Sequence, residues 1–235
     1  MPPVSELFDA IDATWPPARL LRQPPWELRV GEGGGKRVSA ATAFGPLRDA
    51  AISEAEGAMR SLGQSPLFML RAEDKVLDAA LAERGYRLVD PVSVLVSPLS
   101  ALTDRPVPPV TCFTVWEPLA IMKEIWAQGG IGSARLAVMH RAATKTGLFG
   151  RCGNRPAGCG FAAVSGEIAM VHAVEVLPGM RRRGVAGWIM RQAAFWARDH
   201  GAKHIVVLCT DANKSALQLY SGLGFERAAR YHYRQ

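Results

Sequence analysis

The sequence predicts a fold of the α/β (α+β) class, in which helices flank a twisted mixed sheet that is mostly antiparallel. Three extended apolar runs follow one another with short turns between them, at 146–152, 158–164 and 168–176. Runs of this length, bounded by turn residues, are typical of neighbouring antiparallel strands. The third run ends at Pro178 and Gly179, because proline cannot donate to a strand ladder and glycine tolerates unusual backbone angles. A helical pattern follows directly.

The elements of the first hundred residues are expected from apolar periodicity and from the glycines and prolines that interrupt it. They are a helix at 5–14, a strand at 26–30 with a hairpin partner at 37–43, a helix at 47–62, a strand at 67–70, a helix at 74–84 and a strand at 87–96. Proline pairs at 16–17 and 24–25 predict turns before the hairpin. The glycines at 31–35 lie beside Lys36 and Arg37, and they indicate a hairpin tip rather than a phosphate cradle, because no helix opens behind them.

The later elements follow a proline-rich stretch that is typical of a linker. They are a strand at 112–115, helices at 119–128 and 133–142, the three strands already described, a helix from Val185 that ends before Gly201, a strand at 205–210, a helix at 213–223 and a strand at 226–233. The chain is expected to divide into a domain at 1–101, a linker at 102–110 and a second domain at 111–235.

The two halves carry a weak internal repeat. When residues 85–86 are set over 224–225, an offset of 139 (224 − 85), a strand, a helix and a glycine–aromatic pair recur in the same order. Leu81 then lies over Tyr220, and the loop after the third strand run has the short, arginine-free segment 44–46 as its counterpart. We therefore expect the N-terminal half to be a degenerate copy that does not catalyse.

Composition and charge argue against several classes of protein. Of the 235 residues, 49% are hydrophobic and 21% charged, which is usual for a globular protein with a sizeable core. No apolar run is long enough for a bilayer, and the start of the chain lacks the features of a signal peptide, so we expect a cytoplasmic protein without a membrane partner. The net charge of +7 suits an anionic ligand. The positive residues are scattered along the sequence, which argues against a nucleic-acid-binding protein. The four cysteines lack metal-ligand spacing, so no metal is expected.

The turn and helix start after the third strand run have the features of a phosphate-binding loop. Unpaired N–H groups and the helix dipole make the first turn of a helix partly positive. Small residues there let a phosphate approach closely, and arginines add charge-assisted donors. We expect a pyrophosphate site here, against the alternative of a solvated basic run. Its expected members are Arg181, Arg182, Arg183, Gly184, Val185, Ala186 and Gly187.

Two segments resemble the signatures of the GNAT superfamily of N-acetyltransferases. The segment 176–186, read Val-x-Pro-x-x-Arg-x-x-Gly-x-Ala, is similar to the acetyl-CoA-binding motif of that family. The segment 213–225 resembles its second signature, in the same order along the chain. The resemblance is strong over 111–235 and weak before it. It implies the GNAT fold, here as two tandem copies, and acetyl-CoA as cosubstrate.

The resemblance also implies roles for residues near the cofactor. Backbone groups around Val174, Glu175 and Val176 would bind the pantetheine arm and polarise the thioester carbonyl. Tyr220 would give a proton to the departing thiolate, and Asn213, two helical turns earlier on the same face, would lie near the cofactor. Taken alone, each has a structural alternative, a tyrosine at the edge of the core and an asparagine that caps a helix.

The general base is expected to be His172 or Glu175. Strict alternation along 168–176 places His172 on the same face as Val174, and Glu175 on the other. Histidine titrates near neutral pH, which suits a base, although a histidine in an apolar strand is more often a core group. Cys209 is expected to pack in the core, because the family transfers the acetyl group without an acyl-enzyme.

The predicted function is an acetyl-CoA-dependent N-acetyltransferase that moves the acetyl group directly from the thioester to a primary amine of a small molecule or protein. The alternative is a non-catalytic module that binds acyl-CoA and serves a protein partner. The identity of the amine and the oligomeric state stay open, because neither 119–142 nor the N-terminal half carries a readable code.

Overall fold

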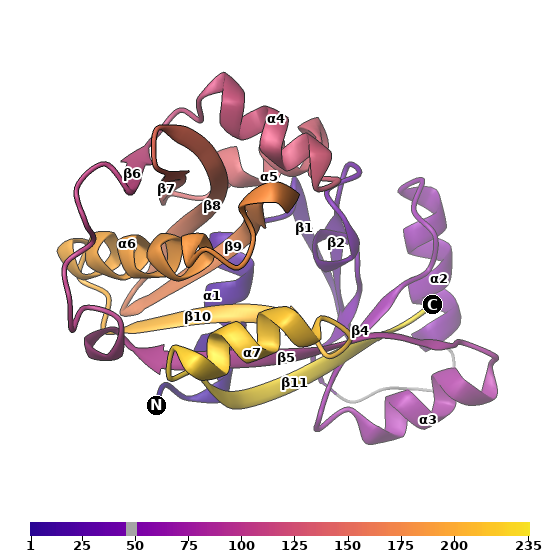
Figure 1. Ribbon diagram of the computed structural model, residues 1–235. Coiled ribbons are helices and arrows are strands. Elements are labelled where there is room, and N and C mark those ends of the chain that lie inside the picture. The colour runs from indigo at the N-terminus through magenta and orange to yellow at the C-terminus, as the bar shows by residue number, and fades with distance from the viewer. Residues whose placement is uncertain (46–50) are drawn as a thin grey trace.

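The structure is a computed structural model that describes residues 1–45 and 51–235 (Figure 1). The first half contains α1 (Val4–Thr14), β1 (Arg19–Gln23), β2 (Trp26–Val30), the 3₁₀ turn η1 (Lys36–Val38), β3 (Thr42–Ala43), α2 (Ala51–Ser61), β4 (Phe68–Arg71), α3 (Lys75–Glu83), β5 (Leu88–Pro98) and η2 (Leu99–Ala101). The second half contains β6 (Cys112–Val115), α4 (Ala120–Gln128), α5 (Ser133–Arg141), β7 (Thr144–Cys152), β8 (Arg155–Ser165), β9 (Ile168–Val176), η3 (Pro178–Met180), α6 (Val185–Asp199), β10 (His204–Thr210), α7 (Lys214–Gly222) and β11 (Glu226–Arg234).

Within the described ranges these strands form two sheets. The larger has eight strands in the order β4-β11-β5-β10-β9-β8-β7-β6, and the smaller has three in the order β1-β2-β3. Every neighbouring pair is antiparallel except β9 and β10, which run parallel. The expected class, a mixed and mostly antiparallel sheet flanked by helices, is therefore confirmed.

The small sheet differs from expectation. β1 pairs with β2 in a hairpin that sets Gln23 opposite Trp26, where the prolines predicted only turns. Four of its five residues are exposed, so β1 has no apolar alternation that would reveal it. The hairpin partner expected at 37–43 is reduced to the two-residue β3, which pairs antiparallel with β2, and the turn η1 occupies the residues before it. The start of the helix expected at 47–62, and the last residue of the segment 44–46, lie outside the described residues.

The internal repeat recurs in the backbone of the large sheet. Helices α3 and α7 have the same bounds after a shift of 139 residues (214 − 75). The strand pairing repeats as well, because Leu208 lies opposite Val94, and at the same shift Met69 lies opposite Tyr233. Strand β5 thus sits between β10 and β11, while β11 sits between β4 and β5. The sheet runs without interruption from one half of the chain to the other.

The large sheet is covered on both faces, as Figure 1 shows for α6 and α7 on one side and α1 on the other. Successive residues of a strand point to opposite faces. Accordingly Val171 and Val207 belong to the core cluster that contains α6, whereas their neighbours Met170 and Val206 belong to the cluster that contains α1. Helices α4 and α5 extend the α1 side over β8, where they pack around Phe161.

Strands β9 and β10 separate toward their carboxyl ends. Their parallel pairing joins residues 168–171 to 204–207 and stops there, although both strands continue beyond it. At the same point a β-bulge interrupts the pairing of β9 with β8, and Ala173 adopts a positive φ of 52°. A bulge bends its strand and increases the local twist. The result is a wedge-shaped opening between the two parallel strands.

The bulge also changes which side chains share a face, so the strict alternation expected along 168–176 is wrong. Residues 172 and 175 pair with Phe161 and Cys159, which are two apart on β8 and share a face. Glu175 therefore lies on the same side as His172, against α4, while Val174 packs against the α6 core. The one extra residue at the bulge reverses the alternation of side chains between the two faces of β9. The apolar sequence of this strand contains no feature that predicts the bulge.

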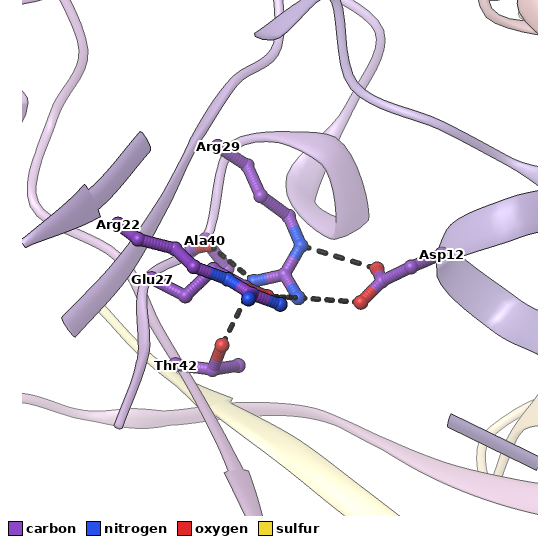
Figure 2. Close-up of polar contacts among 6 residues, drawn as sticks. All are labelled: Asp12, Arg22, Glu27, Arg29, Ala40 and Thr42. Atoms are coloured by element: carbon purple, nitrogen blue, oxygen red, sulfur yellow. Dashed lines mark hydrogen bonds and ion pairs between the residues drawn. The ribbon is translucent and has the colours of Figure 1, made fainter. Parts of the chain in front are cut away.

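A buried arginine fastens the small sheet to α1, as Figure 2 shows. The guanidinium of Arg29 has no exposed surface and donates two hydrogen bonds to the Asp12 carboxylate, at 3.1 and 2.7 Å. It also donates to Glu27 at 3.0 Å, to the Ala40 carbonyl at 3.2 Å and to the Thr42 hydroxyl at 3.0 Å. Because a buried guanidinium is tolerated only when its donors are satisfied, this network holds α1 and the segment after η1 in a defined position.

Candidate active site

A cavity of about 1060 Å³ occupies the wedge between β9 and β10. Its walls include the end of β9, the first turn of α6 and one side of α7. The N-terminal half adds a further wall, made of Trp15 after α1 and residues 34–37 around η1. The cavity therefore lies where both halves of the chain meet, and most of the site residues expected from the sequence line it. Those residues are His172, Val174, Glu175, Val176, Arg181, Arg182, Gly184, Val185, Ala186, Gly187, Asn213 and Tyr220.

One end of the cavity is formed by the uncapped start of α6, which has the features of an anion site. Gly184 is the N-cap of α6 in the left-handed conformation, at φ 77°, and no side chain caps the helix. The first N–H groups of α6 are therefore available at a partly positive helix end. Arg181 is anchored, since its Nε donates to the Val176 carbonyl at 3.1 Å. Arg182 also lines the cavity, whereas Arg183 is exposed and is not part of its wall.

Tyr220 lies on the cavity wall from the side of α7. It is 7% exposed, its ring packs 5.6 Å from that of Phe225, and its hydroxyl has no hydrogen-bond partner among the described residues. Burial raises the pKa of this phenol above its usual 10.0, with a smaller contribution from Cys209, so the hydroxyl is a proton donor at neutral pH. Asn213 caps α7, accepting hydrogen bonds from the Ala216 N–H at 3.1 Å and the Ser215 hydroxyl at 3.0 Å. Both alternatives expected for Asn213 are compatible with this position, because it also lines the cavity.

His172 is buried, and both of its ring nitrogens are engaged. The Thr14 hydroxyl donates to the Ala10 carbonyl at 2.6 Å, so it accepts a hydrogen bond from His172 Nε2 at 3.0 Å. The lone pair of Nδ1 then accepts from Arg37 Nη1 at 3.1 Å. Burial, together with the Arg37 charge, holds the pKa of His172 well below its ordinary 6.5. This network assigns a neutral imidazole whose only lone pair is already occupied.

Glu175 is half-buried on the same face, and its carboxylate has no hydrogen bond or ion pair within the described residues. It packs closely beside the α4–α5 junction, where a Cβ added to Gly129 would lie 2.5 Å from its Cδ. Burial raises the pKa of Glu175 above its ordinary 4.5, and the Arg181 charge opposes this only in part. A lone carboxylate with a raised pKa in a cavity has the properties of a general base.

The sequence reasoning missed the contribution of the N-terminal half to this cavity. It interpreted the glycine-rich stretch before Lys36 and Arg37 as a plain hairpin tip, yet both cations line the cavity, as does Trp15. Arg135, in the first turn of α5, joins them. The run of glycines beside two cations was the available signal, but only the folded chain brings it next to β9.

Cys209 also lines the cavity, but its thiol is not activated. Cys209 is buried near α7, its thiol donates to the Thr210 and Asn213 carbonyls at 3.5 and 3.8 Å, and burial raises its pKa. This is a core thiol rather than an activated nucleophile.

Within residues 1–45 and 51–235, no group of three or more His, Cys, Asp or Glu side chains is arranged to hold a metal ion. In the same ranges, no helix combines the length and apolarity needed to cross a bilayer.

Comparison with known proteins supports the sequence signatures. Residues 115–225 match the model of the Acetyltransferase (GNAT) family. A stretch of 70 residues is 39% identical to streptothricin acetyltransferase from Streptomyces lavendulae, and this match covers 28% of the chain and 37% of that protein. The chain thus spans little more than a third of this curated relative.

Solved structures resemble the chain along its whole length. A GCN5-related N-acetyltransferase from Kribbella flavida superposes with a TM-score of 0.73 at 19% identity, over 100% of this chain and 95% of that chain. A tandem GNAT protein from the clavulanic acid biosynthesis pathway gives a TM-score of 0.62 at 15% identity, over 99% of this chain and 87% of that chain. At these identities the likeness concerns the fold, which is that of the GNAT family.

Proposed function

We propose that this protein, whose residues 115–225 match the model of the Acetyltransferase (GNAT) family, transfers an acetyl group from acetyl-CoA directly to a primary amine. The observation that carries this proposal is a single cavity lined by an uncapped helix start, an unpartnered tyrosine hydroxyl and an unpartnered carboxylate. An anion site, an acid and a base are the parts that acyl transfer from a phosphorylated thioester requires.

The residues present suit coenzyme A. The N–H groups at the start of α6, with Arg181 and Arg182, would hold the pyrophosphate, while Arg183 would act only through its charge. The half-buried end of β9, from residue 174 to 176, is not paired with β10 and would offer backbone groups to the pantetheine arm. A backbone donor there would also polarise the thioester carbonyl, which is usually a large contribution to catalysis.

Glu175 is the base in this proposal, and Tyr220 is the acid. Glu175 takes a proton from the ammonium group, directly or through water, and the neutral nitrogen forms the C–N bond as the C–S bond breaks. Tyr220 gives its proton to the departing thiolate, and the second proton of the acylated nitrogen passes through water to the tyrosinate, which restores the phenol. The sequence favoured His172 over Glu175 as the base, but the one lone pair of His172 is occupied by Arg37, so it acts by positioning this wall of the site.

The N-terminal half, 1–101, is proposed to be a degenerate copy of the same fold, joined through 102–110 to the catalytic half at 111–235. The repeated strand register supports a common origin. Its counterpart of Tyr220 is Leu81, which is fully buried and cannot give a proton. Its role would be to complete the acceptor side of the cavity.

The test is a direct measurement of binding and turnover. Calorimetry should show acetyl-CoA binding, and thiol release should depend on an added amine from a panel that includes amino acids, polyamines, peptides and streptothricin. Tyr220→Phe should lower kcat by about 10²-fold to 10⁴-fold with little change in acetyl-CoA affinity. Binding without turnover across the panel would instead favour a non-catalytic acyl-CoA-binding module, and unimpaired turnover in Tyr220→Phe would remove the acid from the mechanism.

A further inference from the structure

Two arginines at the acceptor end of the cavity lack an acidic partner. Arg37 and Arg135 both line the cavity, and neither forms an ion pair within the described residues. Neighbouring cations differ in this respect, since Lys36 pairs with Asp90 at 2.6 Å and Arg141 pairs with Glu32 at 2.6 Å. Two uncompensated positive charges therefore face the space where the acceptor must bind.

The two guanidinium groups come from opposite sides but meet the same loop. A Cβ added to Gly35, two residues before Arg37, would lie 3.5 Å from Arg135 Nε. The glycine loop of the N-terminal half thus packs directly against the first turn of α5. Both arginines therefore line the cavity near this loop.

Arg37 is held in a costly environment. Its Nη1 donates to His172, its guanidinium lies 5.6 Å from the centre of the Trp15 ring, and its Nε is buried with no acceptor among the described residues. A half-buried guanidinium whose Nε is enclosed without an acceptor is unfavourable unless something satisfies it. Since no carboxylate of the described chain does so, a negatively charged ligand is the natural partner.

We infer that the acceptor is a small amine that carries a carboxylate, an amino acid in the general sense, and that Arg37 and Arg135 bind this carboxylate. The inference rests on the proposed function. Arginine presents paired donors that match a carboxylate, and such charge-assisted bonds are the strong ones. Glu175 lies on the same face of β9 as His172, the residue that Arg37 touches, so the expected base and Arg37 lie on the same side of this strand. A simple amine or polyamine would be repelled by these two arginines and has no carboxylate to offset that repulsion.

The test uses pairs of acceptors that differ only by the carboxylate, namely lysine and cadaverine, tyrosine and tyramine, tryptophan and tryptamine, and histidine and histamine. Within each pair the ratio of kcat/KM values is measured by thiol release. The amino acid should be favoured in at least one pair, and Arg135→Gln should reduce that ratio by about tenfold or more. Because the two members also differ in amine pKa, the informative quantity is the change in ratio between the wild-type protein and the variant.

Arg155→Gln is the matched control, since this arginine is exposed at the β7–β8 turn and makes no contact with the cavity. It removes the same charge and should leave every ratio unchanged. Equal ratios in the wild-type protein and Arg135→Gln, or a preference for the decarboxylated members, would overturn the inference even if acetyl transfer is efficient.

Failure of the proposed function would be seen separately, as an absence of turnover with every acceptor. In that case the same pairs are titrated calorimetrically into protein saturated with coenzyme A. Tighter binding of the amino acid that is weakened in Arg135→Gln would support a carboxylate site without catalysis. Equal binding of both members would refute the site.

Discussion

Replacing Glu175 by glutamine separates the two candidate bases of this site. The change keeps the shape of the side chain and removes its ability to accept a proton. If Glu175 deprotonates the amine, kcat/KM should fall by about 10²-fold to 10⁴-fold, the usual contribution of a positioned general base. The carboxylate has no protein partner whose loss would complicate this interpretation.

The pH dependence has a definite sign. Burial raises the pKa of Glu175 above 4.5, so the wild-type kcat/KM should rise with pH through a value above 4.5 that belongs to this group. The rise of kcat/KM that is due to ionisation of Glu175 should be missing from the pH profile of the variant. Only the rise due to deprotonation of the amine should remain. A carboxyl whose pKa is raised by folding destabilises the folded protein at pH values where it is ionised. Glu175→Gln should therefore be no less stable than the wild-type protein at pH 7, and the difference should vanish as pH falls below the unfolded-state pKa.

The assay is thiol release over a range of pH, together with thermal unfolding of the same samples. His172→Ala is the comparison variant. It should retain the acidic limb, but it should lose about 2–4 kcal/mol of unfolding free energy, because it leaves a cavity and strips the Thr14 and Arg37 groups of their partner. If Glu175→Gln keeps full activity, or if the limb disappears in His172→Ala instead, the assignment of the base is wrong.

Three further outcomes are expected. Asp12→Ala should lower the free energy of unfolding by about 1–3 kcal/mol in urea titrations, since the buried Arg29 guanidinium would keep only Glu27 as an anionic partner. An unchanged urea concentration at half-unfolding would mean that the network does not hold the N-terminal half in place. Gly184→Val should cost about 1–3 kcal/mol, because valine tolerates the φ of 77° poorly, and calorimetry should show weaker acetyl-CoA binding; normal affinity would argue against the start of α6 as the pyrophosphate site. Cys209→Ala should keep turnover within about threefold, because a buried thiol of raised pKa is a poor nucleophile, and a complete loss of thiol release would point to an acyl-enzyme.

Much of the fold could be predicted because its signals are local. The bounds of β6 and β9 agree with expectation, and α6 begins at the expected Val185. In each case apolar periodicity is interrupted by glycine or proline, so neighbouring residues contain the information. β1 was missed because an exposed strand with polar residues has no such periodicity and is defined by its pairing with β2.

Some features of the candidate site were likewise predictable from the local sequence, and others were not. The arginine and glycine pattern at the start of α6 and the position of Tyr220 on α7 are consequences of sequence spacing, and the structure places both on one cavity. The choice between the bases was not accessible from spacing. It depends on a bulge at residue 173 and on Thr14 and Arg37, which lie 158 and 135 residues away from His172 along the chain.

The sequence by itself determined the helices, most strands and the glycine- and arginine-bearing turn before α6, because each is encoded by residues close together in the chain. The internal repeat follows from comparing two such local patterns. Only the tertiary structure decided which side chains meet in the cavity. Long-range strand pairing sets β5 beside β11, a bulge turns Glu175 toward the α1 face, and the Arg29 network brings the N-terminal loop over β9. Contacts of this kind depend on burial and on partners far along the chain, which no local pattern specifies.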